Sequence, residues 1–258
     1  MELGMRAPWR EIRRNKMPAL QACSFYHTML LPDGQEMRGM WDLRPAVDAY
    51  LGHVDFRGRS VLEVGPASGY LSFHMESQGA QVTCVEPPME RLWDAVPLAG
   101  FDMQGWRREF SAAIEGVRNS FWYAHHALDS KVRVFETDAE RLSPDLGSFD
   151  VGVFAAVLLH CKSPMSILQG CAPSVRNTIV VTELYDATLG DQPVCKLLPR
   201  SDIRQVDTWW ALTPAFVVQA LSVLGFDGAR VFVHHQKREF DGAAVPMFTV
   251  VAERSTAR

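Results

Sequence analysis

A single stretch of sequence, residues 61–70, constrains the fold of this chain more than any other. It reads Val-Leu-Glu-Val-Gly-Pro-Ala-Ser-Gly-Tyr, an apolar strand that runs through a glycine-bearing turn into a helix. Gly65 lets the backbone turn sharply off the strand, and Gly69 keeps side-chain bulk away from the ligand at the start of the helix. Further along, a second apolar strand ends on an acid, Glu86, whose carboxylate can accept hydrogen bonds from both hydroxyls of a ribose. This order of elements is typical of a nucleoside-binding α/β site.

Two kinds of nucleoside ligand compete for such a site. A dinucleotide motif, G-x-G-x-x-G, brings backbone N–H groups to a pyrophosphate. Here the middle glycine is absent. Pro66 has no N–H to donate, and Ala67 adds a methyl group where the pyrophosphate would approach. Glu63 places negative charge beside the turn, which favours a cationic ligand over a diphosphate. The turn therefore favours S-adenosylmethionine, with its sulfonium and ammonium groups, and an oxidoreductase that binds NAD is the less favoured reading.

The segment Glu63–Gly69 resembles the E/D-x-G-x-x-x-G motif of class I S-adenosylmethionine-dependent methyltransferases. The resemblance implies that the turn shapes the methionine and ribose end of a cofactor site, and that Asp138 with Ala139 binds the adenine. Asp138 also fits an N-cap for the short turn that follows it, and both roles are compatible. The cofactor-binding residues that we expect are Glu63, Gly65, Pro66, Ala67, Gly69, Glu86, Pro87, Asp138, Ala139, Phe154, Ala155 and Tyr26.

Apolar runs alternate with helical segments from residue 60 onwards, which predicts βαβ units and a parallel sheet. The predicted strands are Ser60–Val64, Gln81–Glu86, Lys131–Glu136, Phe149–Phe154 and Asn177–Glu183. The predicted helices are Gly69–Gln78, Arg107–Leu128, Pro164–Val175 and Pro214–Leu224. Two late runs, Ala229–His234 and Met247–Ala252, predict an antiparallel hairpin that closes the sheet. We therefore expect an α/β fold, a doubly wound, mostly parallel seven-stranded sheet with a C-terminal antiparallel hairpin, as in Rossmann-like methyltransferases.

Length and composition limit the number of domains and the kinds of partner that the chain can have. The 258 residues allow one large domain at 56–258 and an N-terminal extension or lid at 1–55, with a basic, solvated helix near residues 9–20 and a short helix over 44–54. A net charge of −4 argues against nucleic acid as a partner. Five dispersed cysteines argue against disulfides and a metal site, and the absence of a long apolar run argues against a membrane span. These features predict a cytoplasmic protein; the oligomeric state stays open.

A second resemblance narrows the family. Residues 157–164, Val-Leu-Leu-His-Cys-Lys-Ser-Pro, resemble the V-L-Y-H-R-x-S-P segment of the tRNA wobble-uridine carboxymethyltransferase branch, and the segment from Asp207 to Pro214 matches it as well. Leu159 stands where that branch has a tyrosine, which is implied to contact the extra carboxylate of carboxy-S-adenosylmethionine. Leucine cannot donate a hydrogen bond to a carboxylate, so the substitution favours ordinary methyl transfer.

Aromatic residues and histidines suggest the acceptor side of the site. The expected substrate-binding residues are Trp41, Tyr185, Trp209 and Trp210, as a cover over a small apolar or aromatic pocket or simply as a lid packed on itself. His160 is the expected general base, with His27 less favoured. Glu183, at the end of the fifth strand, could orient a substrate hydroxyl or be a solvated strand end.

The sequence therefore predicts methyl transfer from S-adenosylmethionine to a small molecule of secondary or sugar-related metabolism. Two alternatives stay open besides the NAD enzyme. One is an RNA-modifying methyl- or carboxymethyltransferase, and the other is a cofactor-binding module without catalysis.

Overall fold

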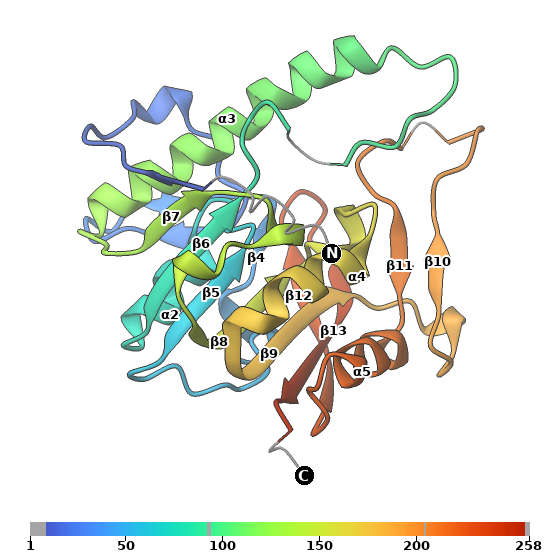
Figure 1. Ribbon diagram of the computed structural model, residues 1–258. Helices are drawn as coiled ribbons and strands as arrows, with labels where there is room; N and C mark the ends of the chain where they lie inside the picture. Colours follow the sequence, from blue (N-terminus) through green and yellow to red (C-terminus); the bar gives the residue numbers. More distant parts are fainter. Residues whose placement is uncertain (1–8, 92–93, 204, 256–258) are drawn as a thin grey trace.

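The computed structural model describes residues 9–91, 94–203 and 205–255, which form a mixed α/β fold around one large sheet (Figure 1). The sheet has nine strands in the order β1-β7-β6-β5-β8-β9-β13-β12-β4. Its strands are β1 (Arg10–Ile12), β4 (Trp41–Asp42), β5 (Ser60–Val64), β6 (Gln81–Glu86), β7 (Arg133–Glu136), β8 (Phe149–Ala155), β9 (Val175–Leu184), β12 (Arg230–Arg238) and β13 (Ala244–Glu253). Two small pairs complete the strands, β2 (Met29–Leu30) with β3 (Glu36–Met37) and β10 (Cys195–Leu197) with β11 (Trp210–Leu212).

The parallel centre of the sheet confirms the sequence prediction. Strands β5 to β9 pair in parallel, and the late hairpin β12–β13 joins them antiparallel through β13 and β9. The predicted and observed bounds coincide for β5 and β6, where the apolar residues are buried on both faces and read as an unbroken run. β12 continues to Arg238, past the predicted end at His234. Its last residues are polar and alternate between buried and exposed, so they did not read as part of an apolar run.

The predicted number of seven strands was too small, because the N-terminal extension adds a strand at each edge. β1 pairs antiparallel with β7, and β4 pairs antiparallel with β12. The expected basic helix near residues 9–20 was wrong, since residues 10–12 are a strand that is held to β7 by backbone pairing and by Arg10 against Glu136. The extension is therefore part of the sheet.

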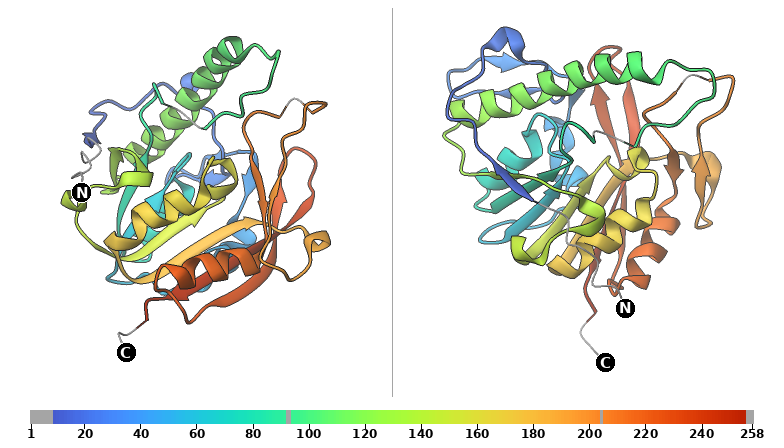
Figure 2. Two further views of the ribbon diagram at one scale, coloured as in Figure 1. Left: turned by 45° about the vertical axis from the view of Figure 1, so that its right-hand side comes forward. Right: turned by 45° about the horizontal axis from the view of Figure 1, so that its top comes forward.

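Helices cover both faces of the sheet, and each face has its own hydrophobic cluster. The described helices are α1 (Val47–Tyr50), α2 (Tyr70–Ser77), α3 (Met103–Ala127), α4 (Pro164–Cys171) and α5 (Pro214–Val223). Alternate residues of β5 face opposite clusters: Val61 packs with α2 and α3, and Leu62 packs with α4 and α5. Figure 2 shows α4 and α5 together on one face. None of the helices in the described part of the chain is long and apolar enough to span a membrane.

Helix α3 begins earlier than predicted and extends past the edge of the sheet. The Asp102 side chain accepts a hydrogen bond from the Gly105 N–H and caps the N-terminus of the helix. The C-terminal half of α3 carries the residues that pack on the sheet, among them Phe121 and Trp122. The preceding loop reaches the segment before β11, where the Val96 N–H donates to the Val206 carbonyl at 2.8 Å (Figure 1).

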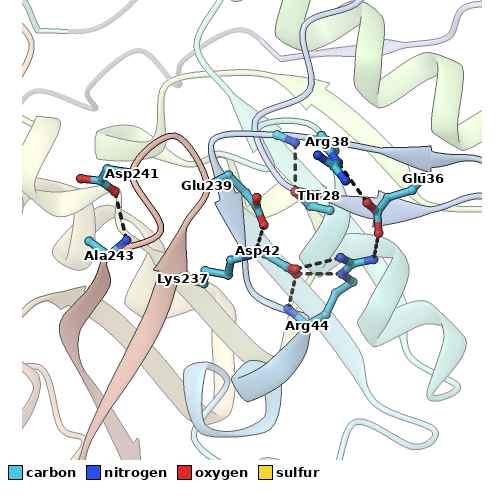
Figure 3. Close-up of polar contacts among 10 residues, drawn as sticks. Thr28, Glu36, Arg38, Asp42, Arg44, Lys237, Glu239, Asp241 and Ala243 are labelled. Carbon is cyan, nitrogen blue, oxygen red and sulfur yellow. Dashed lines mark hydrogen bonds and ion pairs between the residues drawn. The ribbon is translucent and has the colours of Figure 1, made fainter.

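Polar contacts order the N-terminal extension around Arg44 and, beside it, the turn of the C-terminal hairpin (Figure 3). Arg44 donates to both carboxylate oxygens of Asp42, at 2.7 and 2.8 Å, and to Glu36 at 2.9 Å. The Glu239 N–H, in the turn of the hairpin, donates to the Met40 carbonyl at 2.8 Å. These contacts hold the chain before and after β4 at the edge where the parallel strands end.

Gly69 offers a test of the turn between β5 and α2. Its φ is +86°, and an added Cβ would lie 2.5 Å from the Phe73 ring and 2.7 Å from the Phe121 ring. The missing side chain thus serves helix packing. We expect Gly69→Ala to lower the free energy of unfolding by about 2–5 kcal/mol, from left-handed strain plus overpacking.

The matched control is Gly58→Ala, at φ +70° with open space around the new Cβ. It should lose only about 1–2 kcal/mol. Urea unfolding of both variants measures the difference, and equal losses would show that packing at Gly69 is unimportant.

Candidate active site

The residues expected to bind a cofactor meet at the carboxyl edge of the parallel strands. The turn 65–69 follows β5, Glu86 ends β6, and Asp138 comes just after β7. Backbone hydrogen bonds join the three, because the Gly65 N–H donates to the Val85 carbonyl at 2.9 Å and the Thr137 N–H donates to the Glu86 carbonyl at 3.0 Å. Ligands of open parallel sheets bind at this edge. The structure thus places these residues side by side.

The turn after β5 has an unusual backbone. Gly65 and Ala67 have φ of +73° and +49°, and the second value is rarely adopted by a residue with a side chain. A Cβ on Gly65 would lie 2.9 Å from Val157, so the glycine also permits close approach of the loop after β8. Such strained backbone clusters at functional sites.

Ser68 connects this turn to the N-terminal extension. The side chain is fully buried, and its Oγ accepts the backbone N–H groups of Tyr26 and His27 at 3.3 and 3.0 Å. The extension therefore lies directly over the turn, where the sequence predicted a lid. Sequence reasoning missed Ser68, because its partners are distant in the chain.

Glu63 lies beneath the turn, fully buried against α2. Ser72 Oγ and Cys84 Sγ donate to its Oε2 at 2.5 and 3.4 Å. Burial raises the pKa of Glu63 to about 7, and the hydrogen bonds from Ser72 and Cys84 act in the opposite direction. Its charge can act on a ligand only from below the turn.

Glu86 is bound by a residue that the sequence did not single out, Arg118 of α3. The Arg118 Nε–H donates to Glu86 Oε2 at 3.1 Å, and no described donor reaches Oε1. Burial raises the pKa of Glu86 to about 7, and the nearby guanidinium acts against that rise. The helical pattern identified the helix but gave no sign that one of its buried positions holds a cation.

Asp138 is the N-cap that the sequence predicted. Its side chain accepts the Glu140 N–H at 3.0 Å and also binds Arg91 and Arg141. Burial acts to raise the pKa of Asp138, but the two arginines outweigh burial and lower it. Beside it, the buried Thr137 Oγ1 has no hydrogen-bond partner among the described residues. An adenine role for this segment stays a prediction.

The loop after β8 contains the expected base, His160. Its Nδ1–H donates to the Asp207 carbonyl, which leaves the lone pair of the neutral ring on Nε2. Burial lowers the pKa of His160. Ala155 is partly buried at the end of β8, whereas Phe154 has no exposed surface. The expectation that the Phe154 side chain faces the cofactor was therefore wrong, because it points into the cluster under α4.

Glu183 supports this loop from below. It is 1% exposed, so it is not a solvated strand end, and its Oε1 accepts the Leu158 N–H at 2.8 Å. The other oxygen, Oε2, is buried and has no partner in the described part of the chain. Burial raises the pKa of Glu183 to about 8.

His27 lies in the N-terminal extension and is poorly suited to act as a base. It is 7% exposed, and burial lowers its pKa to about 3. Its ring packs on Tyr26 and Tyr70, and its Nδ1 has no described partner. The ring is therefore neutral and weakly basic at physiological pH. Tyr26 is half-buried next to it, and burial raises its pKa.

The four expected substrate residues do not form one cluster. Trp209 donates its indole N–H to the Asp94 carbonyl, and Trp210 donates to the Cys161 carbonyl at 3.0 Å. These two indoles connect the segment before α5 to the loop before α3 and to the loop after β8, and their role toward a substrate stays a prediction. Trp41 is in β4, beside Tyr26, and Tyr185 packs against Phe248. Within the described ranges no group of three potential metal ligands occurs.

Comparison with known proteins identifies the fold. The N-terminal domain of EvdMO1, crystallised in the presence of SAH and D-fucose, superposes with a TM-score of 0.55 at 22% identity, covering 91% of this chain and 93% of that chain. Magnesium protoporphyrin IX methyltransferase from Synechocystis PCC 6803 gives a TM-score of 0.53 at 15% identity, covering 82% and 81%. The chain has the Rossmann-like fold of class I methyltransferases.

Within that class, the sequence is similar to a tRNA U34 carboxymethyltransferase from Alteromonas mediterranea. The two are 28% identical over 178 residues, which cover 68% of this chain and 47% of that protein. The chain spans about half the length of the curated relatives that it matches. No protein-family model matches it.

Glu183 gives the site a testable pH dependence. The unfolded chain releases this proton near the ordinary pKa of 4.5, whereas the folded protein keeps it to about pH 8, so this residue makes stability fall as the pH rises between those values. Glu183→Gln should remove that loss, and its stability relative to wild type should rise by about 1.4 kcal/mol per pH unit within the window.

Urea unfolding at about pH 5, 6 and 7 measures this difference, with the exposed Glu109→Gln as the control. A constant offset between Glu183→Gln and wild type at all three values would contradict the prediction.

Proposed function

We propose that this protein is an S-adenosylmethionine-dependent methyltransferase that acts on a small molecule. The observation that carries the proposal is the convergence of the turn 65–69, Glu86 and Asp138 at one edge of a class I methyltransferase sheet. The five cysteines are free thiols, which agrees with a reducing compartment such as the cytoplasm.

The residues present fit the cofactor. Glu86 Oε1 and the buried Thr137 Oγ1 lack described protein partners and border the region where a ribose and an adenine would lie. The turn with its positive φ values would hold the methionine end, Glu86 the ribose hydroxyls, and residues 137–139 the adenine. When bound, S-adenosylmethionine supplies an electrophilic methyl group on its sulfonium.

The chain's own contribution to the reaction is positioning, exclusion of water and removal of a proton. The carboxyl edge of the sheet is covered by the extension over the turn and by the segments around 94–98 and 206–210. This cover favours in-line alignment of the reactants and excludes water. His160 Nε2 is the atom that would accept a proton from an acceptor hydroxyl or amine, because the Asp207 carbonyl fixes its tautomer.

Several features support a small acceptor. The Asp94 side chain, which accepts the Lys162 N–H at 2.8 Å, places a carboxylate at the cover, and the net charge is −4. Neither feature favours a polyanion. The fold neighbour crystallised in the presence of D-fucose is compatible with a sugar-related acceptor.

Carboxymethyl transfer to tRNA is the second candidate, favoured by the names of the curated relatives. Leu159 opposes it. This side chain is buried, and the Leu159 carbonyl accepts the Trp209 N–H at 2.8 Å, so the position offers no side-chain donor to a carboxylate.

Calorimetry with four ligands tests the proposal: S-adenosylmethionine, its demethylated product, carboxy-S-adenosylmethionine and NAD. We expect binding of the first two, followed by methyl incorporation into small acceptors on screening. Preference for carboxy-S-adenosylmethionine, with methyl or carboxymethyl incorporation into bulk tRNA, would favour the second candidate. Binding of NAD alone would reject both.

Glu86→Gln tests the ribose contact. The amide keeps the size of the side chain but removes the charge, so S-adenosylmethionine binding should weaken by about 1–3 kcal/mol. Calorimetry measures the loss, and the exposed Glu90→Gln, in the same loop, serves as the control. Unchanged affinity in Glu86→Gln would exclude Glu86 from the site.

His160→Gln tests the base once an acceptor is found. Turnover should fall by about 10²- to 10⁴-fold while donor affinity stays near wild type. The exposed His235→Gln, on β12, is the control. Full activity of His160→Gln across the pH range would reduce His160 to a structural role.

A further inference from the structure

Arg118 makes three polar contacts at the tip of β6 that the proposed function does not explain. Its Nε donates to Glu86 at 3.1 Å, one Nη to Glu136 at 3.2 Å, and the other Nη to the Pro87 carbonyl at 2.6 Å. The residue is 8% exposed, although it lies in the middle of a helix that extends to the surface. A desolvated guanidinium is costly unless its donors are satisfied, and here each nitrogen has an acceptor.

The two carboxylates that Arg118 bridges belong to neighbouring strands. Glu86 and Glu136 are register partners at the ends of β6 and β7. Glu136 also binds Arg10 of β1, so it has a second cation, whereas the described ion pairs of Glu86 are with Arg118 alone. The orientation of Glu86 therefore depends on one side chain.

We propose that Arg118 is a positioning residue for cofactor binding, which fixes Glu86 Oε2 so that Oε1 faces the ribose hydroxyls. This inference rests on the proposed function. The guanidinium leaves one oxygen available and favours the ionised form of the acid, whose hydrogen bonds to hydroxyls are roughly twice as strong as those of a neutral group. Without Arg118, the negative charge of Glu136 would act on Glu86 with only Arg14 to oppose it, and Glu86 would take up a proton more readily.

A purely structural role, in which Arg118 only fastens α3 to the sheet, predicts a different outcome. Loss of the fastening would lower stability and affect binding without regard to the state of Glu86. A role through Glu86 predicts a binding loss that depends on pH and disappears when Glu86 is already neutralised.

The test is calorimetric binding of S-adenosylmethionine to Arg118→Met and Arg118→Lys, with Arg133→Met as the control. Arg133 is an exposed arginine of β7 that pairs with Glu11 at 3.0 Å. We expect about 10- to 100-fold weaker binding for Arg118→Met, a smaller loss for Arg118→Lys, and wild-type affinity for Arg133→Met. If Arg118→Met does not fold, Arg118→Lys carries the test, since it keeps the charge but cannot reach three acceptors.

Two further readouts separate positioning from structure. Burial already raises the pKa of Glu86 to about 7, and removal of the cation raises it further, so the loss in Arg118→Met should shrink as the pH rises from about 7 to 9. The ratio of variant to wild-type affinity cancels the titration of the ligand itself. In the Glu86→Gln background, replacement of Arg118 should cause little further loss.

Each outcome decides the inference. A pH-dependent loss that is absent in the Glu86→Gln background supports it. Wild-type affinity in both Arg118 variants, or a loss that adds fully to that of Glu86→Gln at every pH, overturns it while the proposed function stands. If the wild-type protein binds no S-adenosylmethionine, the proposed function fails first and the inference falls with it.

Discussion

The cost of burying carboxylates governs how this site is built. Three glutamates lie at the carboxyl edge of the sheet, and each accepts hydrogen bonds from a different kind of donor. Glu63 accepts hydrogen bonds from a hydroxyl and a thiol, Glu86 accepts one from a guanidinium, and Glu183 accepts one from a backbone N–H. A buried acid without donors would destabilise the fold, so each acid needs its partner. Because the partners come from other elements, each of these bonds also fixes the position of a neighbouring helix or loop.

The same edge is covered by chain segments that are remote in sequence. Ser68 holds the extension over the turn, Asp94 accepts from Lys162 and Trp209, and Glu239 joins the hairpin to Met40. Because these contacts involve backbone groups, they set the positions of the cover segments without requiring particular side chains on one partner. This arrangement suits a reaction in which alignment and exclusion of water supply most of the acceleration.

Much of the fold was predictable because it depends on local patterns. β5 and β6 are short apolar runs with turn residues beyond them, and the N-cap at Asp138 follows from its place before a short turn. The two edge strands were missed, because β1 and β4 are too short to show a period and exist only through pairing with β7 and β12. Phe154 was misplaced because strand position alone does not say which face a side chain takes.

The sequence by itself determined the parallel sheet, the glycine turn after β5 and the acid at the end of β6, since local periodicity and backbone geometry suffice for these. Only the tertiary structure decided that Arg118 bridges Glu86 and Glu136, that Ser68 holds the N-terminal extension, and that Glu183 lies under the His160 loop. Each of these contacts joins residues from separate elements, and their partners are chosen by how the helices and loops pack onto the sheet.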